Sequence, residues 1–144
     1  MPHWSLHQKL AEETVGIGDL ALCRVLLADD ANYPWLVLVP RLPGLIELID
    51  LDDNAQSQLL NEINLAAHAL RSIVQCDKLN IAALGNQVSQ LHVHVIGRRH
   101  NDAAWPKPVW GVNPPLAYGE REKESLLSAL RERLGTATIG SLDR

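Results

Sequence analysis

The 144-residue chain has no phenylalanine, one methionine, two cysteines and no excess of basic residues. Its 13 Lys and Arg residues and 17 Asp and Glu residues give a net charge of −4, whereas a surface dedicated to nucleic acid usually carries a strong basic excess. The longest apolar runs, such as residues 36–39, are far too short to cross a bilayer, and no basic segment followed by an apolar one opens the chain. We therefore expect a cytoplasmic protein with no nucleic-acid partner and no membrane association.

The two cysteines, Cys23 and Cys76, are far apart in sequence and lie in apolar surroundings. This pattern favours buried, reduced thiols over a disulfide framework. Hydrophobic residues make up 47% of the chain and charged residues 21%, values that are ordinary for a globular protein. A chain of this length can bury a core without disulfide or metal staples, so we predict a single domain over residues 1–144.

Apolar periodicity predicts strands and helices in mixed order. Strands are expected over residues 20–28, 36–39, 79–84 and 91–97, with the first two as antiparallel neighbours. Residues 100–115 contain four prolines and are expected to form neither a central strand nor a helix. Crossover helices are too few for a doubly wound parallel sheet. The fold class is therefore predicted to be α+β, an antiparallel β-sheet with packed helices.

Three helices are expected. A capping box at Ser5 and Gln8 predicts a short first helix that ends at Gly16 and Gly18. Apolar residues at three- and four-residue steps predict a long helix over residues 52–75. A C-terminal helix is expected at about 119–134, stopped by Gly135, and the tail at 136–144 shows no period and is expected to be loose.

Two histidines alternate with apolar residues in the segment Gln-Leu-His-Val-His-Val-Ile, residues 90–96. On a strand, the residues at 91, 93 and 95 would form an apolar face, and Gln90, His92 and His94 would lie on the other. Two imidazoles are costly to bury without partners, which indicates a site. Three interpretations are open: half-exposed histidines on a solvated face, two ligands of a zinc site, and acid/base or nucleophilic catalysis.

A glycine-led turn, residues 85–89 with the sequence Gly-Asn-Gln-Val-Ser, comes directly before this segment. Backbone N–H groups and the amide and hydroxyl side chains of such a turn can hold phosphate oxygens without a formal charge. A histidine beside an anion-holding turn suits attack on phosphorus, which favours the catalytic interpretation. The zinc interpretation lacks a third ligand at a paired spacing.

Residues 90–96 resemble the histidine triad (HIT) motif, His-x-His-x-His followed by two hydrophobic residues, with Gln90 in the place of the first His. Residues 36–41 resemble the family's upstream strand, which ends in proline and a basic residue. Asn80 and the turn at 85–87 match its segment before the motif, and Trp105-Pro106 resembles a Trp-Pro pair that follows the motif in one branch. The resemblance covers about residues 20–112 and implies a HIT-like fold.

The resemblance implies a nucleotide-binding hydrolase or transferase that cleaves a nucleotidyl phosphoanhydride or phosphoramidate bond. Expected substrates are dinucleoside polyphosphates, such as a diadenosine polyphosphate, and nucleoside phosphoramidates. His92 would be the nucleophile, held in one tautomer by the backbone carbonyl of Gln90, and would form a covalent nucleotidyl-histidine. His94 would contact the transferring phosphoryl group or help the leaving group. A purine nucleotide substrate, a homodimer, and chemistry without a cofactor or metal are implied.

The remaining implied roles concern substrate binding. Asn86 and Gln87 would hold phosphate oxygens, and Asn80 would contact the same group or brace the turn. Asp29 or Asp30 stands where the family places an acidic residue on the ribose hydroxyls, and the alternative is a plain turn.

Two tryptophans are expected to support the pocket. Trp35 stands where the family has a His, and it can pack beneath His92 and orient it. Trp105 and Trp110 would cover the nucleotide pocket, with a dimer contact or core burial as alternatives. Gln90 and Trp35 favour a rival hypothesis, a catalytically weak or inactive nucleotide-binding regulatory module.

Overall fold

The computed structural model describes residues 3–136, and an antiparallel sheet with the strand order β1-β2-β3-β5-β4 lies at its centre. The strands are β1 (Thr14–Asp19), β2 (Cys23–Ala28), β3 (Trp35–Pro40), β4 (Lys78–Ala82) and β5 (Val93–Arg98). The helices are α1 (Gln8–Glu13), α2 (Asp53–Val74) and α3 (Glu120–Leu134), with a 3-10 turn η1 (Leu48–Asp50). This architecture confirms the predicted α+β class. Within residues 3–136, no helix is both long and apolar enough to cross a membrane.

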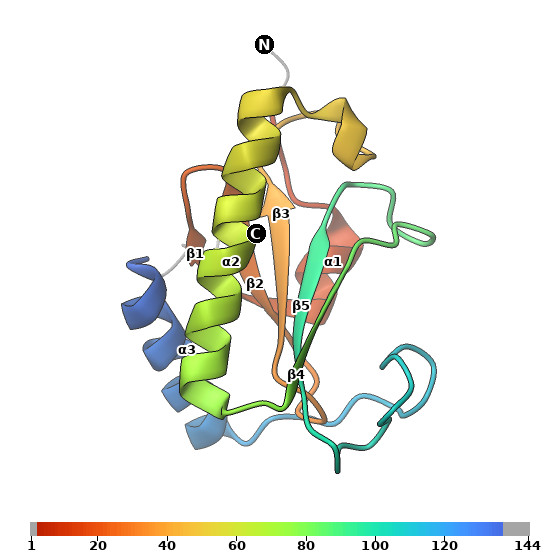
Figure 1. Ribbon diagram of the computed structural model, residues 1–144, viewed down its shortest axis with the longest axis vertical. Coiled ribbons are helices and arrows are strands. Elements are labelled where there is room, and N and C mark those ends of the chain that lie inside the picture. Colours follow the sequence, from red (N-terminus) through yellow and green to blue (C-terminus); the bar gives the residue numbers. More distant parts are fainter. Residues whose placement is uncertain (1–2, 137–144) are drawn as a thin grey trace.

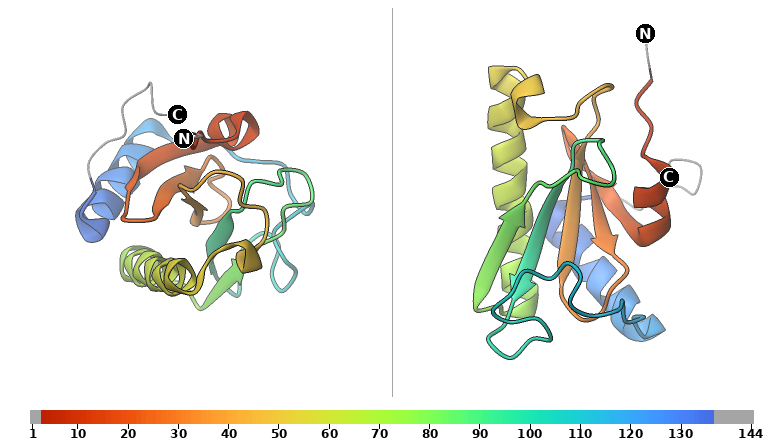
Figure 2. Two further views of the ribbon diagram at one scale, coloured as in Figure 1. Left: turned by 90° about the horizontal axis from the view of Figure 1, so that it is seen from above. Right: turned by 90° about the vertical axis from the view of Figure 1, so that its right-hand side faces the viewer.

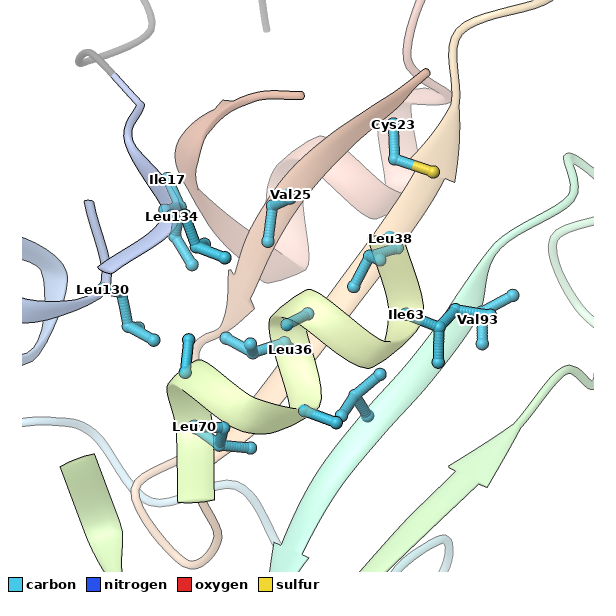
Figure 3. Packing of buried hydrophobic residues seen from close by; sticks show 14 of the residues in the cluster. Ile17, Cys23, Val25, Leu36, Leu38, Ile63, Leu70, Val93, Leu130 and Leu134 are labelled. Carbon is cyan, nitrogen blue, oxygen red and sulfur yellow. The ribbon is translucent and has the colours of Figure 1, made fainter. Parts of the chain in front are cut away.

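The two long helices, α2 and α3, pack side by side against one face of the sheet (Figure 1). Leu36 and Leu38 of β3 and Val93 of β5 point from this face toward Ile63 and Leu70 of α2 (Figure 3). Because each of these aliphatic side chains is almost fully buried, each contributes roughly 1.5–3 kcal/mol of hydrophobic stabilisation. This core holds β3 and β5 side by side at the middle of the sheet.

The opposite face of the sheet carries the short helix α1 (Figure 2). A smaller apolar cluster lies there, formed by Leu10 of α1 with Leu26, Val37, Val39 and Val88. This cluster covers only part of the face. Trp35 packs at its margin and also against a third buried cluster, formed by Tyr33, Ile96, Ala104 and Val109.

The N-terminal part of the chain differs from the prediction. The capping box does not form: His7 is the N-cap of α1, its Nδ1 accepts a hydrogen bond from the Lys9 N–H at 3.0 Å, and the helix ends at Glu13. Residues 14–19, expected to end the helix, form β1 and pair with β2. A six-residue helix is too short to persist alone, and the pairing with β2 buries Ile17 in the main core, so tertiary contacts determine this boundary.

Elsewhere the predicted elements are present with shifted ends. β2 begins at Cys23 because the Leu20 N–H donates to the Cys23 carbonyl and closes a turn to β1. The long helix lies between its N-cap Asp52 and its left-handed C-cap Gln75, within one residue of the prediction. Residues 100–115 form neither a strand nor a helix, as predicted, and Gly135 caps α3 with φ 68°. Of the predicted loose tail, residues 137–144 lie outside the described part of the chain.

Candidate active site

His92 and His94 lie on the sheet face opposite α2. His94 belongs to β5 and pairs with Val37 of β3, whereas His92 comes directly before the strand. Both side chains are only 7% exposed, and their ring centroids are 4.9 Å apart. The interpretation as half-exposed histidines on a solvated face is therefore wrong. Within residues 3–136, no three His, Cys, Asp or Glu side chains are grouped so that they could hold a metal ion.

A single hydrogen bond sets the tautomer of His92. Its Nδ1 lies 2.7 Å from the backbone carbonyl oxygen of Gln90, the contact that the resemblance implies. A carbonyl oxygen only accepts hydrogen bonds, so the proton of the neutral ring must lie on Nδ1. Nε2 is then the ring nitrogen that carries the free lone pair.

The tautomer of His94 is the opposite one. The indole Nε1–H of Trp35 donates to its Nδ1 at 3.0 Å, and an indole N–H can only donate. The proton of the neutral His94 ring therefore lies on Nε2. The structure thus corrects one expectation, because Trp35 binds His94 and not His92. Trp35 donates this hydrogen bond and so fixes the orientation of the His94 ring.

Burial and the neighbouring His92 lower the pKa of His94 to about 4, well below the 6.5 of an ordinary histidine. Between these two pH values the unfolded chain binds more protons at this residue than the folded protein. The free energy of unfolding should therefore decrease as the pH falls from about 6.5 to about 4, by roughly 3 kcal/mol for this residue. Urea denaturation at a series of pH values measures this, with His94→Leu as the variant that lacks the titrating group. An equal pH dependence in both proteins would contradict the prediction.

Two adjoining cavities open beside the histidines. The first, the histidine cavity, has a volume of about 300 Å³ and is lined by His92, His94, Asn86, Gln87, Lys9 and Trp110, among others. The second, the acidic cavity, measures about 460 Å³ and is lined by Glu12, Glu13, Asp29, Asp30, Val37 and Asn113, among others. Trp35, His94 and Trp110 line both, so the two cavities lie on either side of shared side chains.

The predicted phosphate-binding residues divide into two groups. Asn86 and Gln87 lie beside both histidines in the histidine cavity, on the turn led by Gly85, whose φ of 76° suits glycine. Asn80 lies elsewhere, because it pairs with Ile96 and its Oδ1 accepts a hydrogen bond from Arg98 at 2.8 Å. Asn80 lines neither cavity, and its Oδ1 is held by the buried Arg98, so its predicted phosphate contact remains a prediction.

The two adjacent aspartates have different surroundings. Asp30 is buried, and its Oδ1 accepts hydrogen bonds from the backbone N–H and side chain of Asn32 and from the Leu116 N–H. These contacts fix the loop and engage Oδ1 of Asp30 within the protein. Asp29 is exposed at the acidic cavity, and no side-chain partner is recorded for it among residues 3–136. Of the two, Asp29 is the carboxylate that is free to bind a ligand.

The pocket tryptophans are Trp35 and Trp110, not Trp105. The ring centroid of Trp110 lies 5.0 Å from that of His94 and 5.7 Å from that of Trp35. Trp105 instead belongs to a separate cluster: its backbone N–H donates to Asp102, and its ring stacks on the Arg98 guanidinium at 5.5 Å. Arg98 also forms an ion pair with Asp102 at 2.7 Å, and Trp105 lines neither cavity.

Sequence reasoning missed Lys9, which lines the histidine cavity and donates from Nζ to Gln87 Oε1 at 2.9 Å. No motif contains it, and it lies 78 positions from its partner. The sequence also does not predict the contacts of the Gln90 side chain, which binds the N-terminal segment at Ser5 and His7.

Comparison with known proteins places this geometry in a family. The HIT domain family matches residues 9–101. A histidine triad protein from Bradyrhizobium japonicum is 59% identical with a TM-score of 0.91, over 92% of this chain and 99% of that one. One from Marinobacter aquaeolei VT8 is 41% identical with a TM-score of 0.90, over 93% and 98%. One from Sinorhizobium meliloti 1021 is 40% identical with a TM-score of 0.88, over 91% and 97%. The search of curated proteins returned no match.

Proposed function

Because the chain belongs to the HIT domain family, we propose that it binds a purine nucleotide and cleaves a nucleotidyl phosphoanhydride or phosphoramidate bond through a covalent nucleotidyl-histidine. The observation that carries this proposal is the pair of opposite ring tautomers. His92 offers a lone pair on Nε2, and His94 beside it offers an N–H. A nucleophile and a donor next to an anion-holding turn are the groups that phosphoryl transfer needs.

Gln90 takes the first position of the triad in this proposal. The contribution of that position is its backbone carbonyl, which accepts the Nδ1 proton of His92. A backbone acceptor is retained whatever the side chain is. The replacement of His by Gln is therefore compatible with a working nucleophile.

The first step is an attack by His92 Nε2 on the α-phosphorus. A P–N bond forms while the bond from phosphorus to the bridging oxygen or nitrogen breaks, and its electron pair leaves with the leaving group. The imidazolium that results keeps its proton on Nδ1 and donates it to the Gln90 carbonyl oxygen in a hydrogen bond that stabilises the positive charge. In the second step water attacks phosphorus, the P–N bond breaks, and the water loses a proton to solvent. The nucleoside monophosphate is released.

His94 serves in this scheme as a neutral donor. Its Nδ1 already accepts the Trp35 N–H, and its pKa of about 4 keeps it uncharged near neutral pH. The N–H on Nε2 can then hydrogen-bond a phosphoryl oxygen as charge develops there. A neutral imidazole is a very weak acid, so the leaving group receives no proton from it. This favours leaving groups that depart as stable anions, such as a phosphate, over unprotonated amines.

The cavities provide room for both ends of such a substrate. The acidic cavity would take the nucleoside, with Asp29 on the ribose hydroxyls and Trp110 beside it. A third cavity of about 300 Å³, lined by Ile46, Leu48, Gln90 and His92, lies on the far side of the histidine cavity and shares Leu84, Gly85 and His92 with it. A leaving group attached beyond the α-phosphate would extend into this third space. The name of a related fold from Sulfolobus tokodaii, a hypothetical histidine triad nucleotide-binding protein, is consistent with a nucleotide ligand.

The rival proposal is a nucleotide-binding regulatory module with little or no turnover. It is favoured by Trp35, which replaces a His of the family pattern and holds His94 in a form that cannot donate a proton as an acid. Binding of nucleotide is common to both proposals. Only the enzyme forms a phosphorus–nitrogen bond.

Intact-mass spectrometry tests the choice. The protein is mixed rapidly with diadenosine tetraphosphate or adenosine 5′-phosphoramidate and quenched at alkaline pH, where phosphohistidine survives. The expected result is a mass increase of one adenylyl group that maps to the peptide containing His92 and is missing from His92→Ala. Tight nucleotide binding with neither an adduct nor released monophosphate would overturn the enzymatic proposal and select the regulatory module.

A further inference from the structure

The side chain of Gln90 holds the N-terminal segment against the site. Its Oε1 accepts the His7 N–H at 2.9 Å, and its Nε2 donates to the Ser5 carbonyl at 2.9 Å. One amide therefore binds the backbone on both sides of Leu6, whose side chain packs on the small apolar cluster next to α1. The segment 5–7, which we call the N-terminal strap, is thus fixed by two polar contacts and one apolar contact.

The strap leads directly into α1 and places Lys9 at the histidine cavity. His7 Nδ1 accepts the Lys9 N–H at 3.0 Å, which sets the start of the helix. The Lys9 side chain then reaches Gln87 Oε1 at 2.9 Å, on the turn that precedes the histidines. An ammonium group has three N–H donors, so the Gln87 contact leaves donors for a ligand.

The charged side chains that line the two cavities are mostly acidic, and Lys9 is the exception. Four carboxylates line them, those of Glu12, Glu13, Asp29 and Asp30. Among the described lining residues, Lys9 is the one Lys or Arg. A nucleotide brings further negative charge, which the carboxylates alone would repel. Among the described lining residues, Lys9 is therefore the side chain that can supply positive charge to a phosphate bound there.

We propose that Lys9 Nζ binds a phosphoryl oxygen of the bound nucleotide beside His92, and that Gln90 is the positioning residue that holds the strap in place for it. The inference rests on the proposed function, since it assumes a nucleotide in the cavity. It assigns to the Gln90 side chain a role separate from that of its backbone carbonyl. The carbonyl sets the tautomer of His92, and the amide places the cation.

Calorimetric titration with AMP and with adenosine tests the role of Lys9 without any need for turnover. Lys9→Met is expected to weaken AMP binding roughly 10- to 100-fold, the usual effect of losing a charge-assisted hydrogen bond, and to change adenosine binding by less than about twofold. Lys9→Arg should keep most of the AMP affinity. Lys78→Met is the matched control, because it removes the same charge from an exposed position on β4 outside the cavities. AMP affinity that is equal in wild type and Lys9→Met would overturn the inference.

The role of Gln90 is tested by Gln90→Met, which keeps the side-chain length and the backbone carbonyl. The expected result is a several-fold loss of AMP affinity in the wild-type background and no further loss in the Lys9→Met background. Amide hydrogen exchange at residues 5–9 should become faster. Equal losses in both backgrounds would show that Gln90 acts independently of Lys9 and would reject the positioning role.

The outcomes separate this inference from the proposed function. Wild-type protein that does not bind AMP at millimolar concentration would overturn both. AMP binding that depends on Lys9, in a protein that forms no adenylyl adduct, would support the inference and overturn only the covalent mechanism. An adduct in wild type, together with AMP affinity unaffected by Lys9→Met, would support the covalent mechanism and overturn only the inference about Lys9.

Discussion

Replacement of His92 by alanine is expected to lower kcat/KM for a dinucleoside polyphosphate by at least about 10⁴-fold, because the covalent route is removed with the nucleophile. Substrate binding should change far less, since the residues assigned to the phosphate and the ribose remain. The expected signature is therefore a collapse of kcat with a small change in the affinity for AMP. Steady-state kinetics and AMP titration on the same preparation measure the two quantities.

Two controls make this result specific. His68→Ala changes an exposed histidine on α2, away from the cavities, and should leave kcat/KM unchanged. Compared with His92→Ala, His92→Asn keeps more of the buried side-chain volume and a polar group. If His92→Asn is folded but inactive, the loss of activity comes from the missing nucleophile and not from a loss of structure. Activity of His92→Ala within tenfold of wild type would contradict the assignment of the nucleophile.

The row of histidines could be predicted because it depends on local sequence. Alternation along one strand places His92 and His94 on one face, and the face opposite α2 is where the structure has them. The long helix was predictable for the same reason, since its apolar residues repeat within each turn. Each of these features depends on residues only a few positions apart.

The features that sequence reasoning missed depend on contacts between distant residues. β1 forms because residues 14–19 pair with β2, and this pairing outweighs the local helical signal. Lys9 reaches the site across 78 positions of sequence, and the contact between His7 and Gln90 spans 83. Trp35 was expected beneath His92, yet its N–H binds the next histidine along the row. The side-chain direction of a large residue on a neighbouring strand is set by the packed core, which a single sequence does not display.

His94→Ala is expected to lower kcat/KM by about 10²- to 10⁴-fold, less than the loss at His92, because it removes a hydrogen-bond donor and leaves the nucleophile in place. The size of the loss should be similar for a diadenosine polyphosphate and for an adenosine phosphoramidate. The reason lies in the tautomer: His94 holds its proton on Nε2 and accepts the Trp35 N–H on Nδ1, so it stabilises charge and does not protonate the leaving group.

A general acid would behave differently from this donor, since its removal would penalise the amine leaving group much more than the phosphate. Kinetics of wild type and His94→Ala on both substrates therefore distinguish the two roles. Trp35→Phe extends the comparison, because it removes the indole N–H that fixes the His94 tautomer and keeps an aromatic ring. It should reproduce part of the His94→Ala loss, again to a similar extent on both substrates. A loss confined to the phosphoramidate would show that His94 acts as an acid, and equal, mild losses at His92 and His94 would contradict the division of labour between them.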